Sequence, residues 1–99
     1  FDFLSFLLKN KKLNKKICGY GAAAKASTLL NYCGIKNDLI DAVYDAATSK
    51  QNKFLPGSHI PILHPNKIRK DKPDLMIIFP WNLSKEIIKK LSYIKMWNF

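Results

Sequence analysis

The sequence predicts an α/β fold of three layers, in which a mostly parallel sheet of four or five strands lies between helices. Two observations favour this fold class. Short apolar segments that suit buried strands alternate along the chain with amphipathic segments of helical spacing, an order typical of parallel sheets. The first apolar segment also leads into a glycine turn that precedes a helix. Because the chain has 99 residues and no internal repeat, we expect a single domain over residues 1–99.

The first half of the chain predicts a helix, a strand, a second helix and a second strand. Apolar residues recur at helical spacing in residues 2–13, so we expect residues 1–15 to pack on the domain as an N-terminal helix. Residues 16–21 predict a short buried strand. Residues 22–33 contain strong helix formers and end before Gly34, which suits a helix cap. Residues 39–45 predict a second strand that ends in an acid.

The second half predicts further strands, separated by a loop and by a polar stretch. Residues 46–59 lack periodicity and contain the pair Pro56-Gly57, which indicates a loop. Residues 60–63 predict a short strand, which Pro61 places at the edge of the sheet. After a polar stretch over residues 64–73, the continuous apolar run at 74–79 is typical of a strand that is covered on both faces.

Pro80 ends that apolar run, and the rest of the chain predicts one more helix and one more strand. Asn82 suits the start of a helix that continues to about residue 92, with apolar residues on one face. Residues 93–99 predict a last strand. Together the elements give the order expected for a parallel sheet of Rossmann type.

Composition excludes several classes of protein. With 47% hydrophobic residues, the chain is not disordered, and its longest apolar run, residues 75–79, is far below the roughly 20 residues of a membrane span. We therefore expect a soluble, cytoplasmic protein. The first residue is Phe1 rather than Met, which suggests a fragment of a longer chain. Cys18 and Cys33 lack the spacing of a disulfide framework or a zinc ribbon, so we expect both to pack as small apolar residues.

The net charge of +10 suggests a nucleic-acid-binding domain as one alternative function. However, the lysines gather in residues 9–16 and near residues 85–95, where they suit solvated faces. Only one of the 17 cations is an arginine, Arg69, and arginine is the usual bidentate reader of guanine and phosphate. Nucleic acid is therefore not the expected partner, whereas the charge does favour anionic small molecules.

The segment between the first strand and the second helix matches the pattern G-x-G-x-x-G/A of dinucleotide-binding turns. It consists of Gly19, Tyr20, Gly21, Ala22, Ala23 and Ala24. In such a turn the first glycine allows a tight bend and the second lets the backbone approach a phosphate, which then lies on the free amides of the helix. Lys25, Ser27 and Thr28 would add a charge and two hydroxyls. A P-loop is excluded, because alanines stand where it needs a glycine and a hydroxyl.

Further candidate binding residues follow the predicted strands. Asp45 ends the second strand at the distance where an acid usually binds a ribose, whereas Asp41 lies earlier in that strand. Three consecutive residues, Pro80, Trp81 and Asn82, follow the apolar strand, where Trp81 could stack on a ring and Asn82 could bond to it. His59 is a candidate hydrogen-bonding group. No catalytic pair or metal-ligand cluster is visible, so a small NAD-binding module and a purely structural domain stay open as alternatives.

Three blocks, GYGAAAKASTLLNYCGI, PGSHIPI and PDLMIIFPWNL, resemble the C-terminal domain of S-adenosylmethionine-dependent C-methyltransferases, the family that includes deoxysugar C-methyltransferases. The resemblance covers nearly the whole chain. It implies that residues 19–25, His59 and residues 80–82 border a nucleotide-linked sugar. The family differs in two places: it often has glycine where Ala26 stands, and a basic run that contains Asn or Pro after Asp45.

The resemblance also implies where the chemistry takes place. In this family an N-terminal zinc-binding domain and a central methyltransferase domain precede the C-terminal domain. The central domain binds S-adenosylmethionine and contains the catalytic base, so this chain alone would be inactive. The base removes a proton beside the keto group of the sugar, and the enolate carbon then attacks the methyl group of the cofactor. We therefore expect two partners, a nucleotide-sugar substrate and the upstream domain of the same chain.

Overall fold

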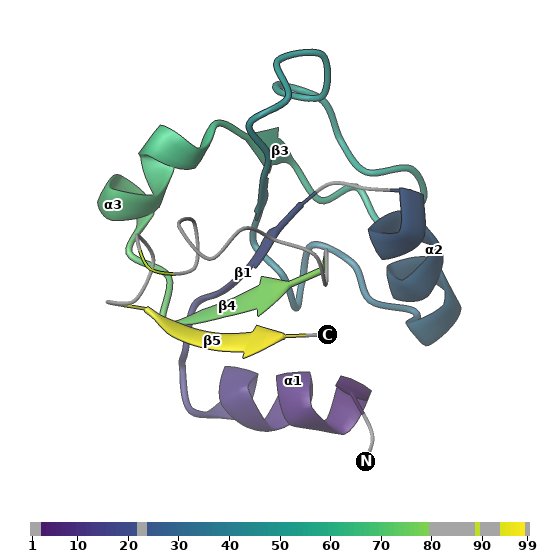
Figure 1. The fold of residues 1–99 in the computed structure, drawn as a ribbon. Coiled ribbons are helices and arrows are strands. Elements are labelled where there is room, and N and C mark those ends of the chain that lie inside the picture. Colours follow the sequence, from purple (N-terminus) through teal and green to yellow (C-terminus); the bar gives the residue numbers. More distant parts are fainter. Residues whose placement is uncertain (1–2, 22–23, 80–88, 90–93, 99) are drawn as a thin grey trace.

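The computed structural model describes residues 3–21, 24–79, 89 and 94–98. They contain one five-stranded sheet in the order β3-β2-β1-β4-β5, and every pair of neighbouring strands is parallel (Figure 1). The strands are β1 (Ile17–Tyr20), β2 (Val43–Tyr44), β3 (Ile62–Leu63), β4 (Leu75–Ile78) and β5 (Lys95–Asn98). This order is that of a Rossmann fold, which confirms the predicted fold class.

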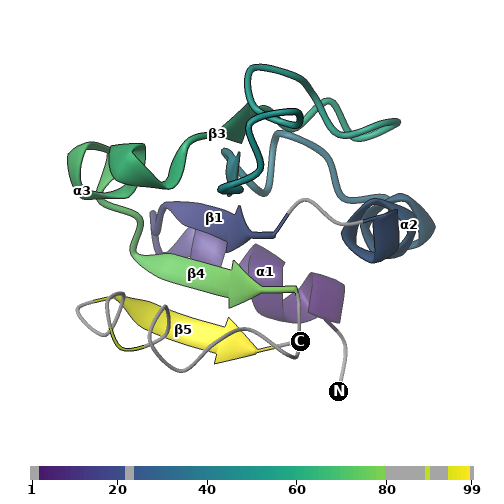
Figure 2. The same cartoon turned by 45° about the horizontal axis from the view of Figure 1, so that its top comes forward.

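Helices cover both faces of the sheet, which gives the three layers that the sequence predicts. Helices α1 (Phe3–Lys12) and α2 (Ala24–Cys33) lie on one face. A 3₁₀ turn, η1 (Pro65–Lys67), and the short helix α3 (Ile68–Asp71) lie on the other, as Figures 1 and 2 show. None of the helices within the described residues is long and apolar enough to cross a membrane.

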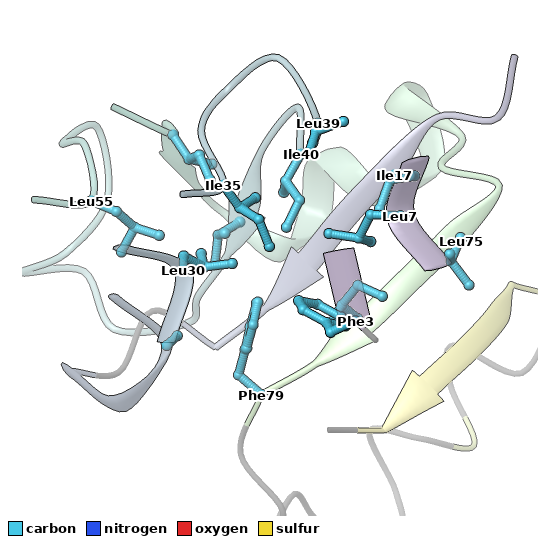
Figure 3. Packing of buried hydrophobic residues seen from close by; sticks show 14 of the residues in the cluster. Phe3, Leu7, Ile17, Leu30, Ile35, Leu39, Ile40, Leu55, Leu75 and Phe79 are labelled. Carbon is cyan, nitrogen blue, oxygen red and sulfur yellow. The ribbon is translucent and has the colours of Figure 1, made fainter. Parts of the chain in front are cut away.

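Alternation along the strands divides the core into two clusters. Ile17 and Ile77 face α1 and α2, where they pack with Phe3, Leu30 and other apolar residues (Figure 3). The neighbouring strand residues point to the other face and pack around Ile68 of α3. All four residues of β1 and all four of β4 are buried. Strands covered on both faces in this way need continuous apolar segments, which is why the run at 74–79 predicts β4 correctly.

Both long helices end in the same kind of cap. Asn14 after α1 has a φ of 59° and Gly34 after α2 a φ of 70°, the left-handed conformation that suits a helix C-terminus. After α2, the Gly34 N–H donates to the Asn31 carbonyl and the Ile35 N–H donates to the Leu30 carbonyl. The buried side chain of Ile35 belongs to the same apolar cluster as Leu30. The sequence predicts the Gly34 cap, and the structure confirms it.

Three segments differ from the predicted elements. Strand β2 is shorter than the strand predicted for residues 39–45. Leu39 and Ile40 are buried, but they lie in a turn in which both of their N–H groups donate to the Lys36 carbonyl. Residues 52–55 of the predicted loop pair antiparallel with residues 60–62 of the predicted strand at 60–63, and we call residues 52–62 the hairpin. The polar stretch forms η1 and α3. The helix predicted for residues 82–92 lies outside the described residues, except for Lys89.

Candidate functional site

The two glycines of the fingerprint have different roles. Gly21 follows β1 with a φ of 96°, and its N–H donates to the Tyr44 carbonyl at 2.8 Å. Gly19 lies inside β1, where a Cβ atom would stand 2.6 Å from the ring of Phe79. Gly21 is therefore the turn glycine, whereas Gly19 leaves room for a core aromatic ring. The sequence interpretation gave the tight turn to Gly19, and the structure moves that role two residues along the chain.

Asp45 stands at the carboxyl edge of the sheet, directly after β2 and beside the end of β1. Its Oδ1 accepts a hydrogen bond from the Ala47 N–H at 2.8 Å, and its carbonyl accepts one from Gln51 Nε2 at 2.8 Å. Tyr20 is buried next to it; burial, and then the charge of Asp45, raise the pKa of the Tyr20 hydroxyl. The structure thus places Asp45 and Gly21 at one edge of the sheet, as the sequence predicts.

Asp41 has a different environment, as its earlier position in the segment suggests. Its N–H donates to the Ile17 carbonyl at the start of β1, which puts Asp41 at the amino edge of the sheet. There its carboxylate pairs with Lys11 at 3.5 Å. Of the two acids, Asp45 is therefore the one at the carboxyl ends of the strands, the edge at which open parallel sheets bind ligands.

The tip of the hairpin docks on α2 through one carbonyl. Ser27 Oγ and Asn31 Nδ2 both donate to the Pro56 carbonyl, at 3.2 Å and 3.0 Å. Gly57 follows with a φ of 83°. A Cβ atom at Gly57 would stand 2.5 Å from Asn31 Oδ1, so the amide of Asn31 fills the space beside this glycine. The Pro-Gly pair of the sequence therefore shapes a turn that fits α2.

A cavity of about 550 Å³ lies between α2 and the segment that follows β2. Figures 1 and 2 show this segment extending beyond the sheet on the side of α2. We call the space the α2–hairpin cavity. It is lined by Ser27, Thr28, Asn31, Ser49, Lys50, Lys53, Phe54, Leu55, Pro56 and Ile62. Its size falls within the range of sites for small organic ligands.

The cavity combines some predicted residues with several that the sequence analysis missed. Ser27 and Thr28 were predicted from the fingerprint. Asn31 was missed because nothing in a helix sequence shows which residue meets a distant hairpin. Lys50, Lys53 and Phe54 lie in a segment without periodicity, so no pattern pointed to them. The sequence signal for these three residues is that two lysines and a phenylalanine lie close together just before the Pro-Gly turn.

The remaining predicted site residues divide into two groups. His59 lies at the hairpin tip with a φ of 58°, and its N–H donates to the Leu55 carbonyl. It is exposed, and it is not among the residues that line the cavity. The other group cannot be placed fully. Ala24 and Lys25 begin α2, but their side chains are not described, and Ala22, Ala23, Pro80, Trp81 and Asn82 lie outside the described residues.

On the opposite face of the sheet, a buried polar cluster ties α3 to β2. The Tyr44 hydroxyl donates to Asp71 Oδ2 at 2.6 Å, and the Cys18 sulfur lies 3.9 Å from that hydroxyl. Burial, and next the hydrogen bond to Asp71, raise the pKa of Tyr44. Burial raises the pKa of Cys18 from 9.0 to about 11. A thiol held protonated is a poor nucleophile, so the cluster is suited to packing rather than to catalysis.

Neither cysteine forms a disulfide, and Cys18 is buried as expected, while Cys33 is half-buried. Within the described part of the chain, no three His, Cys, Asp or Glu side chains come together in a way that could hold a metal ion. The polar groups at the carboxyl edge and in the cavity are hydroxyls, an amide, lysine amines and a carboxylate. They are the groups that bind polar ligands through hydrogen bonds and charge.

Comparisons with known proteins agree with this architecture. The structure resembles the crystal structure of UDP-D-quinovosamine 4-dehydrogenase from Vibrio fischeri with a TM-score of 0.61 and 21% identity, over 85% of this chain and 75% of that chain. At this identity the likeness shows the shared Rossmann fold.

Sequence comparison identifies the family. The C-methyltransferase NovU of Streptomyces niveus is 42% identical over 74 residues, which are 75% of this chain and 18% of that protein. The chain thus matches less than a fifth of the length of this relative. Over residues 1–99 it also matches the model of the C-methyltransferase C-terminal domain. The chain belongs to the family of C-methyltransferase C-terminal domains.

Proposed function

We propose that this chain is the substrate-binding C-terminal domain of an S-adenosylmethionine-dependent C-methyltransferase, and that it helps bind a nucleotide-linked sugar. Methyl transfer is then the work of an upstream domain. Family membership supports the assignment to a C-methyltransferase. The chain matches only 18% of the length of its relative, which supports methyl transfer by another domain. The nature of the groups at the carboxyl edge supports the binding role.

The observation that carries the proposal is that Gly21 and Asp45 lie at the carboxyl edge of the sheet, and that the α2–hairpin cavity lies along α2, the helix that follows Gly21. Gly21 brings the backbone to the helix N-terminus without a side chain, and helix N-termini favour anions such as phosphates. Asp45 ends the neighbouring strand, where a carboxylate can accept hydrogen bonds from sugar hydroxyls. Ser27 and Thr28, near the start of α2, line the cavity. This arrangement suits a ligand with both phosphate and sugar groups.

In the proposed reaction, a base removes a proton from the carbon beside the keto group of the sugar. The electron pair of the broken C–H bond forms an enolate, whose carbon attacks the methyl group, and the C–S bond to the sulfonium breaks. S-adenosylmethionine supplies this electrophilic methyl group when it is bound by the upstream domain. The residues of this chain act by binding and orientation, which keep the reacting carbon in line with the methyl group.

The test is calorimetric titration of the chain with deoxythymidine diphosphate, with NAD as the competing ligand. Asp45→Asn is the informative variant, because an amide oxygen still accepts the hydrogen bond from Ala47 while the charge is lost. Asp38→Asn, at an exposed acid in the turn after α2, removes the same charge elsewhere.

We expect deoxythymidine diphosphate to bind more tightly than NAD, and we expect Asp45→Asn to weaken it by a factor of about 3 to 10 through loss of a charge-assisted hydrogen bond. Asp38→Asn should leave the affinity unchanged. Tight NAD binding that depends on Asp45 would instead identify a small NAD-binding module. If deoxythymidine diphosphate does not bind, the proposed substrate-binding role of this chain is wrong.

A further inference from the structure

We propose that the α2–hairpin cavity holds the nucleoside diphosphate part of the substrate, with Lys50 and Lys53 paired to the phosphates and Phe54 stacked on the base. This inference rests on the proposed function and adds to it the residues that recognise the ligand. None of these three residues belongs to the glycine fingerprint. They come from the segment after β2, on the far side of the cavity from α2.

The charge of the cavity points to an anion. Lys50 and Lys53 both line it, and none of the described residues that line it is an aspartate or a glutamate. Within the described part of the chain, the cavity lining therefore carries two cations and no carboxylate. The net charge of +10 adds a long-range attraction for anions. A diphosphate supplies the matching negative charge, and it has several oxygens that can accept hydrogen bonds from lysine amines.

The aromatic residue points to a flat ring beside that anion. Phe54 lines the cavity and is 62% exposed, so its ring is accessible to a ligand. An exposed aromatic ring in a cavity that also contains lysines offers a stacking surface for a nucleobase. Lysines beside an aromatic ring thus fit both halves of a nucleoside diphosphate.

Pairing within the hairpin fixes the position of two of these residues. The Lys53 carbonyl accepts a hydrogen bond from the Ile62 N–H at 2.8 Å, and Phe54 forms an antiparallel bridge with Pro61. Because Ile62 begins β3, both side chains start from backbone that is bonded to the sheet. A site built on fixed backbone loses less conformational entropy when a ligand binds.

The opposite wall is fixed by the contact between the hairpin tip and α2. Ser27 and Asn31 line the cavity and also donate to the Pro56 carbonyl. Thr28, which follows Ser27 in α2, is exposed and also lines the cavity, so its hydroxyl can form a hydrogen bond with a sugar or phosphate oxygen. Both walls of the cavity thus present polar groups from backbone that is held in place.

The experiment compares two ligands, deoxythymidine diphosphate and inorganic pyrophosphate, on four variants of the 99-residue chain. Lys50→Gln and Lys53→Gln remove one charge each, and Phe54→Leu removes the ring but keeps an apolar side chain. Lys70→Gln is the control, because Lys70 is an exposed lysine on α3 and lies on the opposite face of the sheet. Circular dichroism confirms that each variant is folded.

We expect each of the two lysine variants to raise the Kd of both ligands by about tenfold, the loss of one charge-assisted contact. Phe54→Leu should raise the Kd of deoxythymidine diphosphate by about tenfold through lost stacking, and should leave pyrophosphate binding unchanged. Lys70→Gln should change neither. Added salt should weaken both ligands in the wild-type chain and have less effect in the lysine variants.

Each other result contradicts a named part of the inference. If deoxythymidine diphosphate binds the wild-type chain and none of the three cavity variants weakens it, the ligand lies elsewhere and the proposed function stands without this site. If Phe54→Leu has no effect while the lysine variants do, the cavity is a phosphate site and the base is not stacked there. If neither ligand binds the wild-type chain, the proposed function and this inference fail together.

Discussion

The side-chain amide of Asn31 on α2 fills the space beside Gly57 at the hairpin tip, so that a Cβ atom at Gly57 would stand 2.5 Å from Asn31 Oδ1. Asn31 Nδ2 also donates to the carbonyl of the preceding residue, Pro56. One side chain therefore both bonds to the turn and occupies the space beside its glycine. This pair of contacts sets the distance between the two walls of the α2–hairpin cavity.

Gly57→Ala tests this relationship. The new methyl group would meet Asn31, and the φ of 83° is unfavourable for alanine, so we expect a loss of about 2 to 4 kcal/mol in the free energy of unfolding. Gly34→Ala is the matched control, because Gly34 also has a positive φ but no atom stands near its Cβ position. Its loss should be about 1 kcal/mol.

Urea denaturation measures both losses, and amide exchange locates the change. In Gly57→Ala we expect faster exchange at the His59 and Leu55 amides, which bond within the hairpin. Equal losses in the two glycine variants would show that backbone strain alone accounts for the effect and that the contact with Asn31 contributes nothing.

Gly19→Ala should destabilise the core without changing the turn that follows β1. A Cβ atom at this position would stand 2.6 Å from the Phe79 ring and 3.2 Å from Val43, so we expect a loss of about 1 to 3 kcal/mol from overpacking. The double variant Gly19→Ala with Phe79→Leu should lose less than the sum of the two single losses, because the smaller side chain leaves room. Additive losses in this double-mutant cycle would contradict the assigned role of Gly19.

The buried thiol of Cys18 predicts a loss of stability at alkaline pH. Its pKa is raised from 9.0 to about 11 by burial, so as the pH rises above 9 the unfolded chain loses this proton before the folded chain does. The contribution of Cys18 to the free energy of unfolding is present below pH 9 and is lost as the pH rises to about 11; it amounts to about 3 kcal/mol. Cys18→Ala should show a smaller decrease over that window. Parallel curves for the two proteins would contradict the assignment.

Tyr44→Phe should loosen α3. The variant removes the hydroxyl that donates to Asp71 Oδ2 at 2.6 Å and leaves the carboxylate without that bond, so we expect a loss of about 1 to 3 kcal/mol. Lys72, whose N–H closes α3 on the Ile68 carbonyl, provides a local probe by amide exchange. Faster exchange at Lys72 is the expected result, and unchanged exchange would show that α3 does not depend on Tyr44.

The sheet could be predicted from the sequence because its signals are local. The apolar run at 74–79 suits only a strand covered on both faces, and Gly34 marks the end of α2 by its own conformation. Leu39 and Ile40 misled the prediction of β2, because an apolar residue that fills the core from a turn has the same sequence signal as one in a strand.

The candidate site could be predicted only where it follows the strands. Gly21 and Asp45 come directly after β1 and β2, so the fold class alone brings them to one edge. The contact between Asn31 and Gly57 joins residues 26 positions apart, and it depends on how the hairpin folds back on α2. Lys50, Lys53 and Phe54 become a site only through that contact, which no local pattern encodes.

Amide chemical-shift mapping during titration with deoxythymidine diphosphate tests the central claim most directly. We predict that the shifts concentrate at Gly21 after β1, and on the two walls of the α2–hairpin cavity at Ser27 and Thr28 and along residues 49–54. The amides of α3 on the opposite face should stay unchanged. Shifts confined to α3 or to the amino edge around Asp41, or no shifts at saturating nucleotide, would contradict the claim that this chain binds the nucleotide of the substrate.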